Sequence, residues 1–134
     1  TVSNETEIVL IHDAARPFVS DTIITDCLTV LENADGSAPI LDSQNSLMKW
    51  DGKKAFSINR SEIKIVQTPQ CFQKELIIKA LSADIEGTDE IGMVLETYPD
   101  SSLKFIMGDK YNLKITMEMD LFTAKKILDK IQVI

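Results

Sequence analysis

The stretch Glu7-Ile8-Val9-Leu10-Ile11-His12-Asp13-Ala14-Ala15-Arg16-Pro17 predicts a strand that ends in a polar loop. Residues 7–12 contain four successive apolar residues, Ile8 to Ile11, which are rich in β-branched side chains and do not alternate with polar ones, as is typical of a buried parallel strand. Pro17 lacks the N–H that continued pairing needs, so the strand ends before it. Ser20 is a suitable N-cap for a helix with apolar residues at helical spacing up to residue 31. Strand, loop and helix together form half of a βαβ unit.

The rest of the chain continues this alternation of strands and helices. Apolar runs predict strands at 37–41, shortened by Pro39, at 63–66 and at 103–107, and a short extended piece at 112–116. Helices are expected at about 73–82, at about 90–98, and after Thr116, which would cap the last helix. This order predicts an α/β fold.

Residues 42–60 interrupt the pattern and predict a β-hairpin arm. Two short apolar runs flank Asp51-Gly52, a dipeptide typical of a tight turn in which both central residues take positive φ. The arm carries Met48, Trp50 and Phe56, which an isolated hairpin cannot bury. We therefore expect the arm to pack against a second subunit.

Composition and charge narrow the range of partners. The 134 residues are 44% apolar and 26% charged, and the formal net charge is −7. This charge argues against nucleic acid and against an anionic membrane, because both attract basic surfaces. Cys27 and Cys71 have no metal-binding or disulfide spacing, and Cys27 lies on an apolar helical stripe. We expect a cytoplasmic protein with reduced thiols.

Polar side chains gather where the predicted strands end, which is where open α/β sheets place their ligands. The Asp13 carboxylate could bind a divalent metal, and the Arg16 guanidinium could bind a phosphate through two N–H groups. Alternatively, the two side chains could form an ion pair that only stabilises the loop. Lys114 lies in a short apolar segment, where a buried ammonium needs a partner such as a bound anion. The remaining candidates also have structural explanations: Ser43 and Arg60 lie at the roots of the arm, Thr68 lies in the Gln-Thr-Pro-Gln turn, Thr88 can act as an N-cap, and His12 is best explained as a satisfied structural histidine.

Six short segments, taken in order, resemble the 2-C-methyl-D-erythritol 4-phosphate cytidylyltransferase family. They are HDAARPF at 12–18, DS at 42–43, NRS at 59–61, QTPQCF at 67–72, TDE at 88–90, and NLKIT at 112–116 followed by DL at 120–121. The related ribitol-5-phosphate cytidylyltransferases share much of this pattern. The resemblance covers nearly the whole chain and implies part of a Rossmann-like nucleotidyltransferase sheet with a projecting hairpin arm. It also implies the family's activity, which joins a polyol phosphate to CMP from CTP and releases pyrophosphate, a step of isoprenoid precursor synthesis.

The resemblance further implies roles for the matching residues. Asp13 would lie near Mg²⁺ and the acceptor, Arg16 would bind the acceptor, and Lys114 would stabilise charge on the transferring phosphate. In the family the arm builds a homodimer and brings residues of the Ser43 and Arg60 type to the neighbouring site. The implied substrate contacts are Ala14, Ser43, which stands where the family usually has threonine, Arg60, which would hold the acceptor phosphate, Thr68 and Thr88.

One part of the family pattern has no counterpart here, the glycine-rich loop that holds CTP. The five glycines of the chain are scattered, and none forms a loop that could cradle a triphosphate. We therefore expect residues 1–134 to be the C-terminal portion of one cytidylyltransferase domain, with its N-terminal nucleotide-binding segment absent, and to be inactive alone. Three alternatives stay open: an enzyme acting on ribitol 5-phosphate for cell-wall or capsule polymers, a nucleotidyltransferase for another sugar phosphate, and an inactive fragment that only dimerises or binds a partner through its arm.

Overall fold

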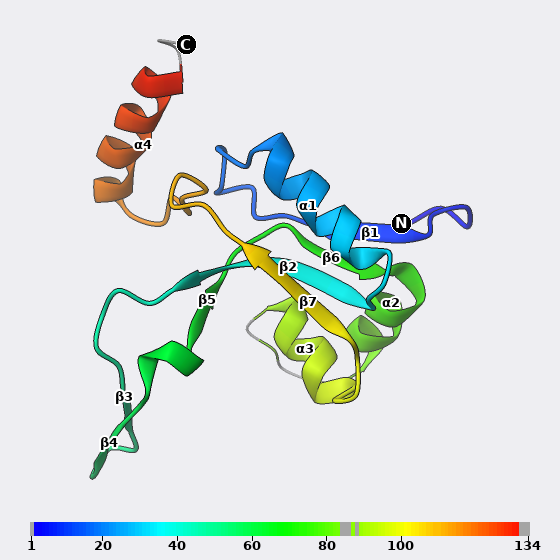
Figure 1. Ribbon diagram of the computed structural model, residues 1–134, viewed down its shortest axis with the longest axis horizontal. Coiled ribbons are helices and arrows are strands. Elements are labelled where there is room, and N and C mark those ends of the chain that lie inside the picture. Colours follow the sequence, from blue (N-terminus) through cyan, green and yellow to red (C-terminus); the bar gives the residue numbers. More distant parts are fainter. Residues whose placement is uncertain (1, 84–86, 88, 132–134) are drawn as a thin grey trace.

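A five-stranded mixed sheet with helices on both faces organises the part of the chain that the computed structural model describes, residues 2–83, 87 and 89–131 (Figure 1). Its strands are β1 (Ile8–Ile11), β2 (Gly36–Asp42), β5 (Lys64–Val66), β6 (Gln70–Gln73) and β7 (Leu103–Met107). Cys71 and Phe72 are neighbours on β6, so their side chains point to opposite faces. Cys71 packs against α1 (Asp21–Leu31), and Phe72 packs against α2 (Lys74–Ser82) and α3 (Glu90–Thr97). The α/β class predicted from the sequence is confirmed.

The strand β2 lies at the centre of the sheet. On one edge it pairs in parallel with β7, with Gly36 opposite Leu103. Its other edge is shared by two antiparallel strands, β6 beside its first residues and β5 beside its last. The residues between β5 and β6, 67–69, therefore lie where the edge of β2 passes from one partner to the other.

The prediction that residues 7–12 form a buried parallel strand is wrong in two respects. The strand β1 pairs with β6 in the antiparallel direction, and Leu10 is 39% exposed. Val9 and Ile11 pack against the core, whereas Ile8 and Leu10 point to the other, less covered face. An apolar run shows that a strand can be buried, but the direction and the covering of the strand depend on neighbours that the run does not specify.

Pro39 does not shorten β2, contrary to expectation, since the strand continues from Gly36 to Asp42. In a strand the N–H and C=O of one residue point to the same edge. The C=O of Pro39 accepts a hydrogen bond from the N–H of Gln67 at 2.9 Å, so the missing N–H of Pro39 faces the junction between β5 and β6. The paired ladders of those two strands begin on either side of it, and the sheet tolerates the proline there.

The hairpin arm consists of β3 (Met48–Trp50) and β4 (Ala55–Ser57), followed by a short 3₁₀ helix, η1 (Arg60–Glu62). It projects away from the sheet, and Trp50 is 61% exposed, as predicted (Figure 1). The turn differs from the prediction, because only Gly52 has positive φ, at 91°. Asp51 instead closes a longer loop with its carboxylate, which accepts hydrogen bonds from the N–H groups of Lys53 and Lys54, both at 2.8 Å.

The predicted helices all form, with small changes at their starts. Ser20 caps α1 through a bond from the N–H of Ile23, and Cys27 is buried in the core as expected. Asp89 is the N-cap of α3, and Thr88, the residue predicted for that role, lies outside the described residues. Ahead of α4 (Glu118–Ile131), the Thr116 hydroxyl donates to Asp120, so the carboxylate of Asp120 and not Thr116 closes the first turn. The strand β6 was not predicted, because Gln67-Thr68-Pro69-Gln70 is typical of a turn and only two residues separate it from the helix expected at about residue 73.

Candidate functional site

Three loops from distant parts of the sequence meet beside Asp13. Asp13 follows β1, Thr68 lies between β5 and β6, and Lys114 lies between β7 and α4. The N–H of Asp13 donates to the Thr68 hydroxyl at 3.0 Å, which joins the first two loops. The N–H of Ile115 donates to the carbonyl of Ala15 at 2.8 Å, which brings the third loop alongside the first. The fold therefore gathers at one edge the residues that the sequence places far apart.

His12 and Thr68 form a fixed support beneath this meeting point. His12 Nε2 lies 3.0 Å from the carbonyl oxygen of Arg16, which can only accept a hydrogen bond, so Nε2 carries the proton. In the neutral ring Nδ1 is then an acceptor, and the Thr68 hydroxyl donates to it at 2.9 Å. Both ring nitrogens are thus satisfied, which supports the structural role predicted for His12. The Thr68 hydroxyl accepts from Asp13 and donates to His12, so it positions the loop as well as lining the site.

Two cations bind the same carboxylate oxygen of Asp13. Arg16 Nε and Lys114 Nζ each lie 3.1 Å from Asp13 Oδ2. Arg16 also donates through Nη1 to the carbonyl of Asn112 at 2.8 Å, so its guanidinium is held in place by two separate segments. Lys114 is different, because its side chain is 46% exposed. One carboxylate against two cations leaves a net charge of +1 at this point.

The pKa of the Asp13 carboxyl is held below its ordinary value of 3.8. Partial burial pushes the pKa upward, but the hydrogen bonds and positive charges of Lys114 and Arg16 outweigh that effect. A depressed pKa in the folded state stabilises the protein above the unfolded pKa, and this contribution is lost as the pH falls through the folded pKa. Asp13 is therefore ionised throughout the neutral range.

We expect the carboxyl carbon of Asp13 to titrate below pH 3.8 in an NMR titration. The Lys114→Ala variant should move this midpoint upward, because it removes the cation whose hydrogen bond lowers the pKa of Asp13 most. Lys110→Ala removes the same charge from a nearby exposed position and serves as the control. An Asp13 midpoint that is the same in the wild type and in Lys114→Ala would contradict the ion pair.

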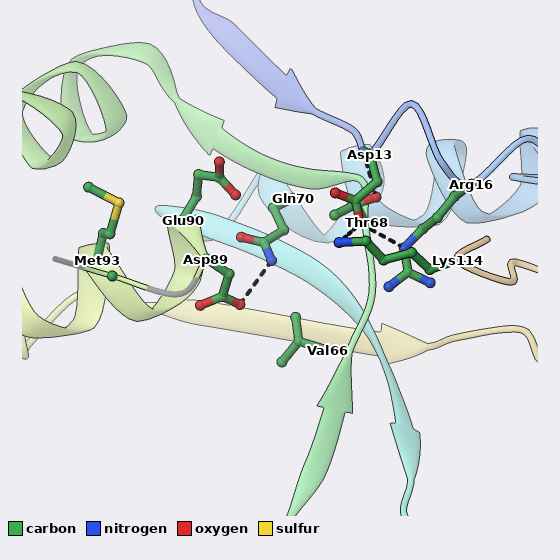
Figure 2. Close-up of a pocket in the computed structure, with 10 residues that line it drawn as sticks. Asp13, Arg16, Val66, Thr68, Gln70, Asp89, Glu90, Met93 and Lys114 are labelled. Carbon is green, nitrogen blue, oxygen red and sulfur yellow. Dashed lines mark hydrogen bonds and ion pairs between the residues drawn. The ribbon is translucent and has the colours of Figure 1, made fainter. Parts of the chain in front are cut away.

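The ion pairs lie at one end of a cleft of about 600 Å³ (Figure 2). Asp89 and Glu90, at the start of α3, line the cleft farther from Lys114, and the Gln70 side chain donates to Asp89 Oδ2 at 3.0 Å. The cleft therefore has a cationic end and an acidic end. A ligand that carries a phosphate at one end and several hydroxyls at the other matches this distribution, since carboxylates accept hydrogen bonds from hydroxyls. The lining residues are Asp13, Arg16, Val66, Thr68, Gln70, Gly87, Asp89, Glu90, Met93 and Lys114.

The family model described as 2-C-methyl-D-erythritol 4-phosphate cytidylyltransferase matches residues 1–130 of the chain. The chain belongs to this family. A protein of that name from Clostridium botulinum (strain Okra / Type B1) is 39% identical over 137 aligned residues, which cover 97% of this chain and 58% of the relative. Another from Bacillus cereus (strain ATCC 10987 / NRS 248) is 32% identical, covering 94% of this chain and 57% of that protein.

Solved structures agree with the family assignment. The crystal structure of 4-diphosphocytidyl-2C-methyl-D-erythritol synthase from Anaerococcus prevotii DSM 20548 superposes with a TM-score of 0.85 at 28% identity, over 96% of this chain and 59% of that one. The cytidylyltransferase of Thermus thermophilus gives a TM-score of 0.79 at 28% identity, over 91% and 62%. The nucleotidyltransferase fold implied by the sequence is thus confirmed. The chain spans somewhat more than half the length of the curated family members that it matches.

Within this cytidylyltransferase framework, four of the predicted site residues line the same cleft: Asp13, Arg16, Thr68 and Lys114. Ser43 and Arg60 do not; they line a separate hollow of about 360 Å³ at the root of the arm, with Asp42, Gln44, Ser61 and Lys64. Ala14 is exposed on the turn beside Asp13 and does not line the cleft. Thr88 lies outside the described residues. Among the helices of the described part, none is long and apolar enough to cross a membrane.

Several residues that the structure places at the cleft were given no function from the sequence. Gln70, Asp89 and Glu90 line its acidic end, and Gln67 lies behind its cationic end. All four belong to motifs that carried the family resemblance. The sequence feature that could have pointed to them is a polar residue within one of these motifs, next to apolar residues of a strand. Whether it faces the cleft or supports it from behind is decided by the sheet register.

Proposed function

We propose that the protein containing this chain transfers CMP from CTP to 2-C-methyl-D-erythritol 4-phosphate and releases pyrophosphate. The observation that carries the proposal is the cleft of this family member, in which Arg16, Lys114 and Asp13 converge at one end and two carboxylates lie at the other. The acceptor is a short polyol with a terminal phosphate, so its charge and its hydroxyls match the two ends of the cleft.

The chemistry needs placed positive charge more than it needs a covalent catalyst. An oxygen of the acceptor phosphate forms a bond to the α-phosphorus of CTP, the bond from that phosphorus to the bridging oxygen breaks, and pyrophosphate leaves with the electron pair. Negative charge grows on the oxygens of the transferring phosphate. Lys114 lines the cleft with a partly exposed side chain and is held by Asp13 at 3.1 Å, so its ammonium can stabilise that charge. Arg16 is more enclosed and chiefly fixes Asp13 and the Asn112 segment.

Mg²⁺ is the metal that the family implies, and Asp13 is the residue that fits it. Both cations bind Oδ2 of Asp13, which leaves the Oδ1 side of the carboxylate facing away from them. Within residues 2–83, 87 and 89–131, no group of three or more His, Cys, Asp or Glu side chains is placed to hold a metal ion. Mg²⁺ is commonly held by one or two carboxylates together with substrate phosphates, which this site allows. Bound in that way, the ion would neutralise phosphate charge.

We further propose that the arm forms a homodimer. The exposed faces of Met48, Trp50 and Phe56 support this, since such an apolar group on a projecting hairpin favours association. Arg60 and Ser43 lie at the root of the arm, away from the cleft of their own protomer. In the dimer these two residues would reach the acceptor at the partner's cleft. Both cysteines are free and buried, which is compatible with a reducing cytoplasmic compartment.

The test is a pyrophosphate-release assay on the whole protein with CTP, Mg²⁺ and either 2-C-methyl-D-erythritol 4-phosphate or ribitol 5-phosphate. We expect turnover with the first acceptor and a kcat/KM at least about tenfold lower with the second. Residues 1–134 alone should not turn over. Absence of pyrophosphate with both acceptors would refute the proposed activity, and a preference for ribitol 5-phosphate would refute the proposed acceptor.

A further inference from the structure

The side chain of Gln67 is buried behind the cleft and uses both ends of its amide. It is 4% exposed. Its Nε2 donates to the carbonyls of Asp109 at 2.9 Å and of Asn112 at 3.1 Å, and its Oε1 accepts from the N–H of Asp109 at 3.2 Å. A single glutamine therefore replaces a short piece of sheet ladder and holds the turn at 109–112 against the β5–β6 junction.

This turn connects directly to the cationic end of the cleft. The carbonyl of Asn112 that accepts from Gln67 also accepts from Arg16 Nη1 at 2.8 Å. The Asn112 side chain donates to the carbonyl of Thr68 at 2.8 Å, and Lys114 follows two residues later with its ammonium on Asp13. If the turn moves, the Arg16 acceptor and the backbone that carries Lys114 move with it.

Gly108 provides the space that the Gln67 amide occupies. A Cβ built on Gly108 would collide with Gln67 Oε1, and it would lie 3.2 Å from the carbonyl oxygen of Ile40. The N–H of Gly108 also donates to that carbonyl at 2.8 Å, so the backbone cannot easily withdraw. A side chain at position 108 and the Gln67 amide in its observed place exclude each other.

We propose that Gln67 is a positioning residue of the site, which holds the 109–112 turn so that Arg16 and Lys114 stay on Asp13 at the cleft. The catalytic consequence rests on the proposed function. The structural part does not, because the hold on the turn can be measured without turnover.

Gln70 offers a matched control within the same motif. It is 2% exposed, and its amide likewise uses both ends, with Nε2 donating to Asp89 Oδ2 at 3.0 Å and Oε1 accepting from the N–H of Ile91 at 2.8 Å. Gln70 therefore holds the start of α3, at the acidic end of the cleft, whereas Gln67 holds the turn at 109–112, behind the cationic end. Replacing either residue removes the same chemical group from an equally buried position.

The structural test compares amide hydrogen exchange in Gln67→Ala and Gln70→Ala. Gln67→Ala should raise the exchange rate of the Asp109 and Asn112 amides at least about tenfold and leave that of Ile91 unchanged, and Gln70→Ala should do the reverse. Gln67→Met, which keeps the volume of the side chain, should reproduce the local effect if the alanine variant does not fold. Equal loss of protection in both regions for either variant would mean a general loss of stability and would overturn the proposal.

The functional test uses the kcat for pyrophosphate release by the whole protein. Gln67→Ala should lower kcat about 10- to 100-fold and change the KM for the acceptor less, because small displacements of catalytic groups are costly in the transition state. Gly108→Ala should lower kcat in the wild-type background and have a smaller effect in the Gln67→Ala background, where the collision is removed. An unchanged kcat in Gln67→Ala with the turn loosened would overturn the positioning role. An inactive wild type would instead refute the proposed function. The hydrogen-exchange result alone would then decide whether Gln67 holds the 109–112 turn.

Discussion

Replacing Lys114 by alanine is expected to lower kcat for pyrophosphate release by the whole protein by about 10²- to 10³-fold. Of the two cations that contact Asp13, Lys114 is the more exposed. Its side chain is 46% exposed, whereas that of Arg16 is 10% exposed. The loss should fall on kcat more than on the KM of the acceptor, because the charge that Lys114 meets grows as the phosphate transfers. Steady-state kinetics with both substrates varied will separate the two parameters.

Two control variants, Lys110→Ala and Lys114→Arg, separate a change in net charge from the loss of the Lys114 ammonium. Lys110 is an exposed lysine of the same loop that does not line the cleft, so its removal should change kcat by less than about threefold. Arginine at position 114 retains the charge but not the compact ammonium, and should recover only part of the activity. Equal losses in Lys110→Ala and Lys114→Ala would point to net charge and remove Lys114 from the proposed mechanism.

Replacing Phe72 by alanine is expected to lower the free energy of unfolding by about 3–5 kcal/mol. Phe72 is fully buried between the sheet and the helices α2 and α3, in a cluster with Ala38, Ile77 and Val94. A Cβ built on Gly36 would come within 2.8 Å of the Phe72 ring, so the ring lies directly on the backbone of β2. Alanine would leave a cavity that these neighbours cannot close. Urea unfolding followed by circular dichroism measures the change.

Phe105→Ala is the control for this prediction. Phe105 lies on β7, so Phe105→Ala is the same substitution on another strand of the sheet, but this residue is 44% exposed. Its loss should cost less than about 1.5 kcal/mol, since much of the ring already contacts water. Similar costs at the two positions would show that burial in the described fold does not determine the contribution of these rings.

Some features of the site were open to prediction from the sequence because they depend on residue type and order. Asp13 and Arg16 could be singled out because they follow an apolar run, and Lys114 because it interrupts a short apolar segment. That both cations bind one carboxylate oxygen could not be predicted, because Lys114 reaches Asp13 only after β7 has paired with β2 and the following loop has turned back. Gln67 was missed for the same reason: a glutamine in a short turn motif shows nothing of a partner at positions 109 and 112.

Local chemistry alone determined the helices, the arm and the α/β class. Ser20 caps α1 through a bond within the helix's own first turn, and β3 and β4, which flank Asp51-Gly52, pair with each other in a separate two-stranded sheet. Only the tertiary structure decided that β1 pairs antiparallel with β6, that β2 continues through Pro39, and that residues 70–73 form a strand. Strand direction and burial depend on hydrogen bonds between residues far apart in the chain, and local periodicity carries no information about them.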